Sequence, residues 1–465
     1  MIGELCDENK ILKGENKYLL DKLAKAEARA AKAEADLAKA EAKLNRPGKT
    51  SKNSSIPPSQ AIKPNGEAKC ESDIAKLGPR RGHPGSHRPL CDNPTAVMDM
   101  CASTCPHCQA DVSGVEQDAG EVYDHVEIPL APAMITRVVL RRGTCPCCSK
   151  TFKASPPRGM EPGSPYGPNL RATVLHFRHS HAVSYERMAV LLETQFGVKL
   201  SEGALASMLK SAAPAFARET ETIRQRLLAG TVIGSDETRF RVRKENWWLW
   251  VFQNPDSCVF TLSKSRGKDV VEQFLGDERP PAWVSDRLGS QTGWAKKHQA
   301  CLAHLLRDAQ YAIDNGDTVL APSVIPLLCR AIRVWRNRDR LIAKFGTGTL
   351  VAFYWRFFQE LLELLAEPIP GNPVSEKFRR SLTKWQKNLF VFLTRQDVPP
   401  TNNSSEQALR WSAIFRKVTN CFRSVWGGEL HANIRSVLET ARRRNIGALQ
   451  AITLILGGSS LPVPA

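Results

Sequence analysis

Four cysteines in two Cys-x-x-Cys pairs constrain the fold of this chain more than any other feature. The pairs are Cys105–Cys108 and Cys145–Cys148, and 36 residues (109–144) separate them. This spacing lets two thiolates reach one tetrahedral Zn²⁺ from a tight turn. We therefore predict structural Zn²⁺ in a finger over residues 91–155. An exposed redox dithiol is the alternative, but it needs one pair rather than two.

The segment between the two pairs is expected to form a β-hairpin that brings them together. Its strands would be supplied by alternating apolar residues, namely Val122, Val126, Ile128, Ile135, Val138 and Leu140. Seven of the thirteen cysteines lie between Cys91 and Cys148. Such a cluster favours a metal site over disulfides in a reducing compartment.

A seven-residue repeat occupies the N-terminal region. One seam position reads Leu5, Leu12, Leu19, Ala26, Ala33, Ala40, and the other reads Asn9, Asn16, Leu23, Ala30, Leu37, Leu44. Such a repeat buries a narrow stripe against a partner helix, and asparagine in the seam specifies register. The repeat predicts a coiled coil over residues 1–45 that joins at least two copies of the chain. A single solvated helix is the alternative.

The charge balance points to a polyanionic partner. Lys and Arg exceed Asp and Glu by 18 over 465 residues, which is typical of proteins that bind nucleic acid. Residues 46–90 hold nine basic residues, three acidic residues and seven prolines, and they read as a linker. Arg80 and Arg81 could follow a DNA groove, and a solvated tether fits equally well. The sequence has no signal-peptide pattern and no run of 18 apolar residues, so we expect a cytoplasmic protein without a membrane partner.

A helix-turn-helix is predicted over residues 165–225. Apolar residues recur at helical spacing, Ser184 and Ser201 are candidate N-caps, and Gly197 marks the turn between two helices. Lys210 is the basic residue of the second helix and a candidate DNA contact. Any three-helix bundle has the same pattern.

From Thr231 the pattern changes from helices to strands. Three acidic residues end or follow ordered segments: Asp236 at the end of one strand, Asp286 at the end of a later strand, and Glu406 at the start of a helix. Mg²⁺ prefers oxygen ligands, and two or three carboxylates hold a pair of such ions for phosphodiester chemistry. The alternative for each acid taken alone is that it is an ordinary surface residue or a helix cap.

The blocks around these acids resemble the insertion sequence 66 family of bacterial DDE transposases, over nearly the whole chain. The resemblance rests on Asp236-Glu-Thr238, on Val284-Ser-Asp286 followed by Cys301-Leu-Ala-His304, and on Thr401-Asn-Asn-Ser-Ser-Glu406. It implies a ribonuclease-H-like α/β core in which Asp236, Asp286 and Glu406 bind Mg²⁺ or Mn²⁺ and catalyse the reaction. Two departures are Arg287-Leu288, where the family often has Gly-Tyr, and Gln109 and Ser149, where glycine usually follows each cysteine pair.

The expected protein is thus multidomain and α+β. Its parts are a coiled coil (1–45), a linker (46–90), a finger (91–155), a helix-turn-helix (165–225), a core (230–305) with a helical insertion (306–398), C-terminal core helices (399–455) and a tail (456–465). Cys301 and His304 lie three apart on a predicted helix and are expected to pack near the active site. Glu237, next to Asp236 on a strand, should point away from the metals.

The resemblance implies a nucleoid-associated transposase that binds terminal inverted repeats and target DNA, with small companion proteins as further partners. Basic residues beside the glutamate helix would bind phosphates: Arg410, Arg416, Lys417 and Arg423. A transposase-derived DNA-binding regulator and a ribonuclease-H-type nuclease are the alternative functions. The coiled coil and the end-binding segments argue against the nuclease, and the three acid blocks argue against the regulator.

Overall fold

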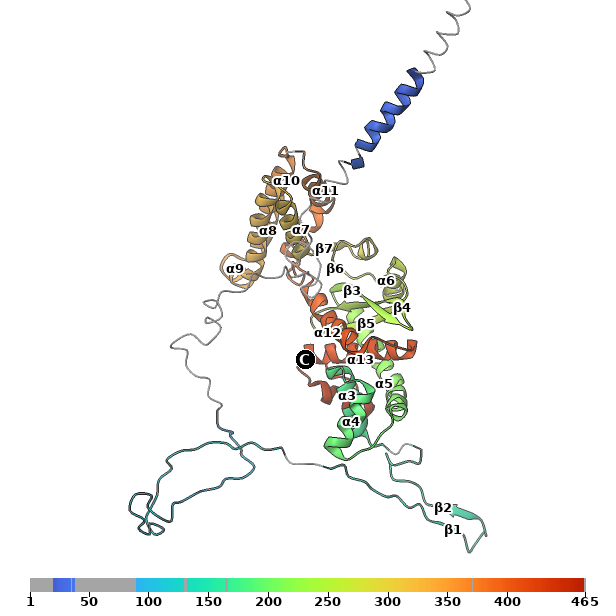
Figure 1. Cartoon of the computed structure of the whole chain (residues 1–465), viewed down its shortest axis with the longest axis vertical. Coiled ribbons are helices and arrows are strands. Elements are labelled where there is room, and N and C mark those ends of the chain that lie inside the picture. The colour runs from blue at the N-terminus through green and yellow to red at the C-terminus, as the bar shows by residue number, and fades with distance from the viewer. Residues whose placement is uncertain are drawn as a thin grey trace, which may run out of the picture. The chain divides into compact units, whose positions relative to one another are not determined.

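The computed structural model describes residues 20–34, 36–37, 89–128, 132–163, 166–369 and 371–463. The chain divides into two units (Figure 1). One comprises Met1–Ile62, Pro156–Tyr185 and Gly203–Ala465, and the other comprises Lys63–Ser155 and Glu186–Glu202. No helix in the described part of the chain is long and apolar enough to cross a membrane.

A five-stranded mixed sheet forms the centre of the larger unit. Its strands are β3 (Val232–Val242), β4 (Glu245–Gln253), β5 (Cys258–Ser263), β6 (Ala282–Ser285) and β7 (Lys297–Ala300). Their spatial order is β5-β4-β3-β6-β7. The pairs β3–β4 and β4–β5 are antiparallel, whereas β6 is parallel to both β3 and β7. Strand β6 consists wholly of buried residues, as expected for a short strand covered on both faces.

Helices cover both faces of this sheet (Figure 1). Helices α12 (Asn403–Thr419) and α13 (Val425–Arg443) pack on one face, where Leu409 and Ala432 meet Phe240 and Phe260 in a buried cluster. Helix α6 (Lys268–Leu275) lies on the other face, and its Phe274 stacks on Phe252 with 3.8 Å between ring centroids. The three predicted acids, Asp236, Asp286 and Glu406, therefore lie on or directly beside elements that pack into this core.

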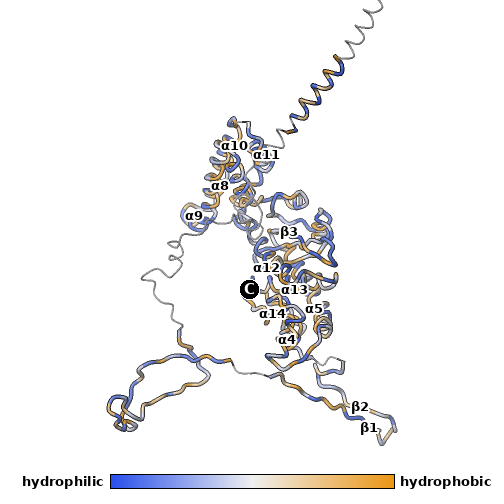
Figure 2. The backbone as a smooth tube through the Cα atoms, in the orientation of Figure 1, coloured by the Kyte–Doolittle hydropathy of each residue, from blue (hydrophilic) through white to orange (hydrophobic). Residues whose placement is uncertain are grey.

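The chain between β7 and α12 forms the predicted helical insertion. It contains α7 (Leu302–Asp314), α8 (Leu320–Arg336), α9 (Arg338–Phe345), α10 (Gly348–Ala366), α11 (Pro373–Trp385) and the 3-10 turns η2 (Gln386–Asn388) and η3 (Val391–Leu393). Hydrophobic and hydrophilic residues both recur along the helices of the insertion (Figure 2). Their apolar faces share one buried cluster with Val232, Ala282 and Ala300 of the sheet. The insertion is thus continuous with the core.

Three helices precede the sheet, where the sequence predicts a helix-turn-helix. They are α3 (Pro168–His181), α4 (Tyr185–Phe196) and α5 (Glu202–Leu228). Ser184 and Ser201 directly precede α4 and α5, and Gly197 adopts a left-handed φ of 69° after α4. The predicted helices are present. A DNA-binding role for them stays a prediction. After α13, helix α14 (Ala448–Leu456) packs against α3 and α13.

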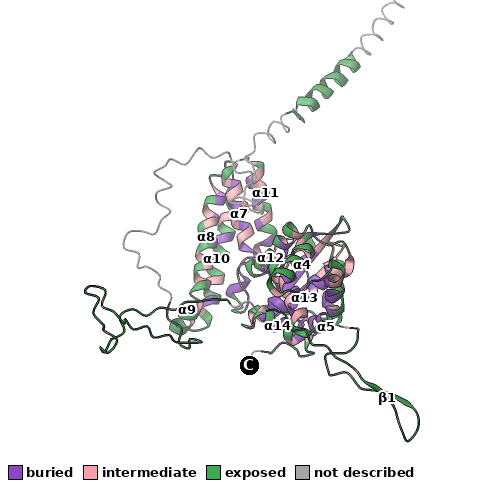
Figure 3. Ribbon diagram, turned by 60° about the horizontal axis from the view of Figure 1, so that its bottom comes forward, coloured by how far each residue is buried: buried purple, intermediate pink, exposed green. Residues whose placement is uncertain are grey.

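The hairpin predicted between the two cysteine pairs is absent from the described residues of that segment. Residues 119–128 and 132–140 have no strand, and apolar side chains there stay exposed, for example Ile128 at 84% and Ile135 at 93%. The two strands of this region instead flank the second pair: β1 (Arg142–Thr144) and β2 (Thr151–Lys153) are antiparallel. Alternating apolar residues form a strand pair only where a second layer covers them, and the side chains here are exposed (Figure 3).

The predicted coiled coil is described only in part. Residues 20–34 and 36–37 are helical and exposed (Figure 3), and the other seam positions lie outside the described residues. The linker 46–90 is described only for its last two residues, so Arg80 and Arg81 also lie outside.

Candidate functional site

Two of the three predicted acids lie next to each other because two strands run parallel. Gly234 of β3 pairs with Val284 of β6, so Asp236 and Asp286 each follow a paired residue by two positions. Asp236 lies within β3, and Asp286 directly follows β6. In parallel strands, equal offsets bring side chains to the same level of the sheet. The parallel pairing thus places both carboxylates at the carboxyl end of β6.

The electrostatic environment of Asp236 includes the other two acids. Burial raises the pKa of Asp236 well above its usual range, and the charges of Glu237, Asp286 and Glu406 raise it further. Negative groups that repel each other in a partly buried site are stabilised by a cation. The side chains are those that a hard divalent ion prefers as ligands, and the Oε1 atom of Glu406 is buried without a hydrogen-bond partner. The three residues therefore fit a divalent metal.

The start of α12 is fastened to the strand that carries Asp236. The Asn402 side chain donates from Nδ2 to the Ser235 carbonyl at 2.7 Å, and its Oδ1 accepts from Ser405 Oγ at 2.7 Å. Ser405 Oγ also accepts from Gln253 Nε2 of β4 at 3.1 Å. Gly234 permits this close approach, because a Cβ atom there would lie 2.5 Å from Gln253 Nε2 and 3.1 Å from Ser405 Oγ. Glu406 follows in the first turn of α12.

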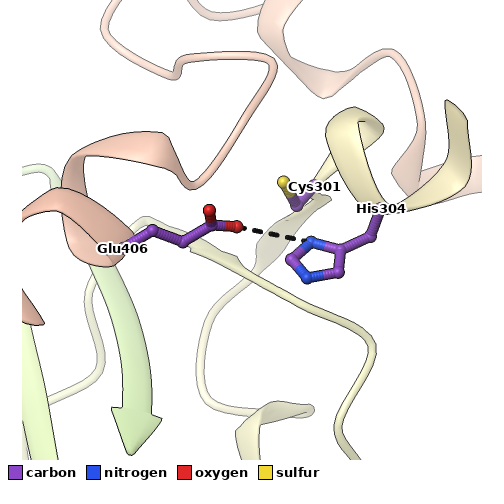
Figure 4. Close-up of side chains that lie close together, drawn as sticks. All are labelled: Cys301, His304 and Glu406. Atoms are coloured by element: carbon purple, nitrogen blue, oxygen red, sulfur yellow. Dashed lines mark ion pairs between the residues drawn. The ribbon is translucent and has the colours of Figure 1, made fainter. Parts of the chain in front are cut away.

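Cys301 and His304 of the insertion lie against the same glutamate (Figure 4). Cys301 Sγ accepts a hydrogen bond from the Asn402 backbone N–H at 3.1 Å. His304 Nδ1 lies 3.8 Å from Glu406 Oε1, and an Arg307 guanidinium nitrogen lies 3.8 Å from Glu406 Oε2. These two separations exceed hydrogen-bond distance. The predicted position of the pair near the carboxylates is observed.

Cys301, His304 and Glu406 could also hold a metal of their own. Their ligand atoms lie within 4.8 Å of one another, and they form the metal-compatible group of His, Cys, Asp and Glu found among the described residues. Burial lowers the pKa of His304, which favours the neutral imidazole that binds metals. A thiolate, an imidazole and a carboxylate together suit a softer ion such as Zn²⁺ rather than Mg²⁺.

Glu237 directly follows Asp236 on β3. It lies on the expected opposite face, since Gln291 bonds both Ser235 and Glu237 two residues apart. Yet its side chain is only 2% exposed, and Arg266 donates two hydrogen bonds to it at 2.9 and 2.7 Å. Burial raises the pKa of Glu237, and the charge of Asp286 raises it further. Strand alternation separates faces, but it does not screen charge in a buried layer.

Two arginines near the acids were not predicted as site residues. Arg307 follows Cys301 and His304 at a further three-residue step, so the helical spacing of α7 was the signal that could have found it. Arg287 replaces the glycine of the usual family pattern. It donates to Ser381 Oγ at 2.6 Å and forms an ion pair with Asp308, which ties the end of β6 to α11 and α7. No local pattern signals that contact.

The predicted DNA-contacting side chains differ in their exposure. Lys210, Arg410, Lys417 and Arg423 are exposed. Arg416 is only half-exposed, because its guanidinium donates to the Arg239 carbonyl of β3. A structural role therefore accounts for Arg416 without DNA.

The two cysteine pairs have matching local geometry. The backbone N–H of Gln109 donates to the Cys105 carbonyl at 2.9 Å, and that of Ser149 donates to the Cys145 carbonyl at 2.9 Å. Gln109 and Ser149 adopt left-handed φ values of 63° and 56°, where glycine is usual. Backbone hydrogen bonds lower the pKa of the first cysteine of each pair. The four thiols form no single cluster within the described residues.

Comparison with known proteins gives one family. The model of the family described as "Transposase IS66 family" matches residues 163–430. The chain belongs to this transposase family. The matched region includes Asp236, Asp286 and Glu406 and leaves out the cysteine pairs. No curated protein matches the chain.

Proposed function

We propose that this member of the IS66 transposase family cleaves DNA at the terminal inverted repeats of an insertion sequence and transfers the freed ends to target DNA. The supporting observation is the meeting of Asp236 and Asp286 on paired parallel strands with Glu406 on a helix fastened to the same strand. The mixed sheet with helices on both faces supports a ribonuclease-H-like core.

In this proposal Asp236, Asp286 and Glu406 hold Mg²⁺ or Mn²⁺. The chemistry that the ions supply when bound is activation of the attacking oxygen and stabilisation of the leaving oxygen. The carboxylates alone would repel a DNA phosphate, so DNA enters productively only after their charge is compensated. Arg307, beside Glu406, adds positive charge at the place where a phosphate would bind. Asn402 and Cys301 keep Glu406 at a fixed position relative to Asp236.

The remaining parts have proposed roles in assembly and DNA binding. The heptad segment would pair two protomers, and α4 and α5 would bind the transposon ends. The two cysteine pairs would meet on one Zn²⁺, for which each pair already has the required turn. Lys210, Arg410 and Arg423 are exposed and available to phosphates, and exposed Lys417 is a further proposed contact.

The decisive experiment compares single substitutions of the three acids on a cognate transposon end. Asp236→Asn, Asp286→Asn and Glu406→Gln should each lower Mg²⁺-dependent 3′-end cleavage by at least about 10²–10³-fold. Their effects should not add, because the acids act as one unit. The matched control is Glu245→Gln, an exposed carboxylate of β4 that pairs with Lys264. Cleavage near the wild-type rate in any acid variant would remove that residue from the site.

Strand transfer from a 3′-OH donor end separates this function from its alternatives. The proposed transposase joins the end to target DNA, a nuclease only cuts it, and a DNA-binding regulator does neither. In all three cases the acid variants should still bind DNA, because affinity comes from the basic surface.

A further inference from the structure

A cavity of about 530 Å³ lies in the helical insertion, away from the three acids in the chain. Its lining residues come mainly from helices α8, α9 and α10, which are labelled in Figure 1. Its lining residues are Arg330, Arg333, Val334, Asn337, Arg340, Leu341, Lys344, Phe345, Phe353, Arg356 and Phe357. We call it the insertion pocket. Its volume lies in the range of natural ligand sites.

The lining of the insertion pocket is strongly positive. It contains four arginines and one lysine, and no acidic residue. Only Arg330 has a carboxylate partner among these cations, namely Glu360. Within the described part of the chain, Arg333, Arg340 and Arg356 are exposed and form no ion pair. Unpaired cations around a concavity produce a focused positive potential that attracts an anion.

Aromatic rings lie beside these cations. Phe353 and Phe357 stack with 5.8 Å between their centroids, and Arg330 lies 5.9 Å from the Phe357 ring. Phe345 is 61% exposed, with Lys344 5.0 Å from its ring. An exposed ring among cations is the arrangement that single-stranded nucleic acid uses, because bases stack on the ring while the cations bind phosphates.

The insertion pocket is also physically connected to the carboxylate site. Helix α7 carries His304 and Arg307 against Glu406, and the same helix packs on α8, which forms one wall of the pocket. A DNA strand bound in the pocket would therefore contact α8, which packs on the helix that contacts the glutamate.

We propose that the insertion pocket binds a single DNA strand, with Arg333, Arg340 and Arg356 on its phosphates and Phe345 stacked on a base. This adds a DNA contact to the proposed function, on which it rests only for the identity of the strand. Recognition is by backbone charge and stacking, so it is independent of sequence.

The test measures binding of a fluorescent 20-nucleotide single strand to the full chain between 50 and 200 mM salt, by anisotropy. The variants are Arg333→Gln, Arg340→Gln and their double. Each lost phosphate contact should reduce the slope of log affinity against log salt by about 0.7, and the double by about twice that. Arg336→Gln is the matched control, since Arg336 is exposed on α8 but does not line the pocket.

Phe345→Ala tests the stacking separately from the charge. It should weaken binding about 5- to 150-fold and leave the salt slope unchanged. Unfolding curves of all variants should match the wild type, because the changed side chains are exposed. A free nucleoside monophosphate should compete only weakly, since it offers one phosphate.

Two results would overturn the inference. One is a slope of log affinity against log salt that stays at the wild-type value in both Arg333→Gln and Arg340→Gln. The other is an equally large decrease of this slope in Arg336→Gln, which would indicate that DNA responds to the overall positive charge of the insertion and not to the pocket. No binding of the single strand by the wild-type chain would also overturn it. Failure of the proposed function looks different: the wild-type chain would then bind the single strand with the expected salt slope but would not cleave a transposon end.

Discussion

At the scale of residues, the position of the Glu406 carboxylate is restricted by side chains that come from another helix, α7. Its Oε1 atom is buried without a hydrogen bond, and side-chain nitrogens of His304 and Arg307 lie 3.8 Å from its two carboxylate oxygens. Such spacing leaves the carboxylate free to turn toward an ion while its position stays restricted. His304 and Arg307 are therefore positioning residues in the proposed reaction.

His304→Ala should lower cleavage about 10- to 100-fold, the usual effect of losing a group that orients a metal ligand. The distinguishing measurement is the Mg²⁺ concentration needed for half-maximal rate, which should rise, and His304→Gln should restore part of the loss. Gln310→Ala, on the same helix and bonded only to Asp314, is the control. An unchanged Mg²⁺ requirement in His304→Ala would limit His304 to packing.

At the scale of elements, the contact between β3 and α12 decides where the third carboxylate lies. Gly234→Ala would place a methyl group 2.5 Å from Gln253 Nε2 and 3.1 Å from Ser405 Oγ. The Gln253 side chain must then move away, and Ser405 of α12 must give by a few tenths of an ångström. We expect a loss of stability of about 1–3 kcal/mol, as for overpacking, measured by chemical denaturation. Cleavage should fall more than stability explains, because small displacements of reacting groups are costly.

The control for that substitution is Gly348→Ala at the start of α10, where no atom lies within 4 Å of the added Cβ. It should leave cleavage unchanged, and stability should stay within about 1 kcal/mol of the wild type or rise, because alanine favours helix. If Gly234→Ala were equally harmless, the close approach of α12 would not matter for the site.

The cysteine pairs lead to a second prediction at this scale. We expect one tightly bound zinc per chain by metal analysis, lost in Cys105→Ser or Cys148→Ser and kept in Cys147→Ser, which lies inside the second pair as a bystander. Zinc supplies roughly 10–16 kcal/mol of folding free energy in small fingers. Purified protein without zinc that still binds transposon ends fully would contradict this.

At the scale of the whole molecule, a buried histidine pair joins α3 to α13. His179 and His431 are 2% and 0% exposed, and their Nδ1 atoms lie 3.3 Å apart. Burial lowers the pKa of both well below the usual value, and the charges of Arg178 and Arg435 lower both further. The native state therefore keeps them neutral, whereas the unfolded chain binds protons below about pH 6.5.

Stability should consequently fall as pH drops below about 6.5, by about 1 kcal/mol per histidine between pH 7 and 5.5. His431→Gln should flatten this acid limb in denaturation curves of the full chain, although it lowers stability at pH 7. The control is His125→Gln, at an exposed position of the cysteine-rich segment. An acid limb of wild-type steepness in His431→Gln would show that other groups cause it.

Local patterns predicted much of this molecule. The strands that carry or lead to Asp236 and Asp286 and the helices of the insertion were expected, because apolar periodicity is set by each element's own buried face. The sequence blocks around the three acids and the two cysteine pairs could also be recognised, since each of these motifs spans only a few residues. The hairpin turn at Arg243 and Lys244 gave no signal: both residues adopt left-handed φ values of 51° and 68°, where Asn-Gly is usual.

Tertiary structure decided what these segments do together. The register that places Asp236 beside Asp286, the approach of Asn402 to Ser235, and the burial of Glu237 with Arg266 depend on residues far apart in the chain. The same is true of the unpaired arginines of the insertion pocket, which come from three helices. Sequence periodicity determines which face of an element is buried. Which partner buries it, and which charges then meet, follows only from packing the whole core.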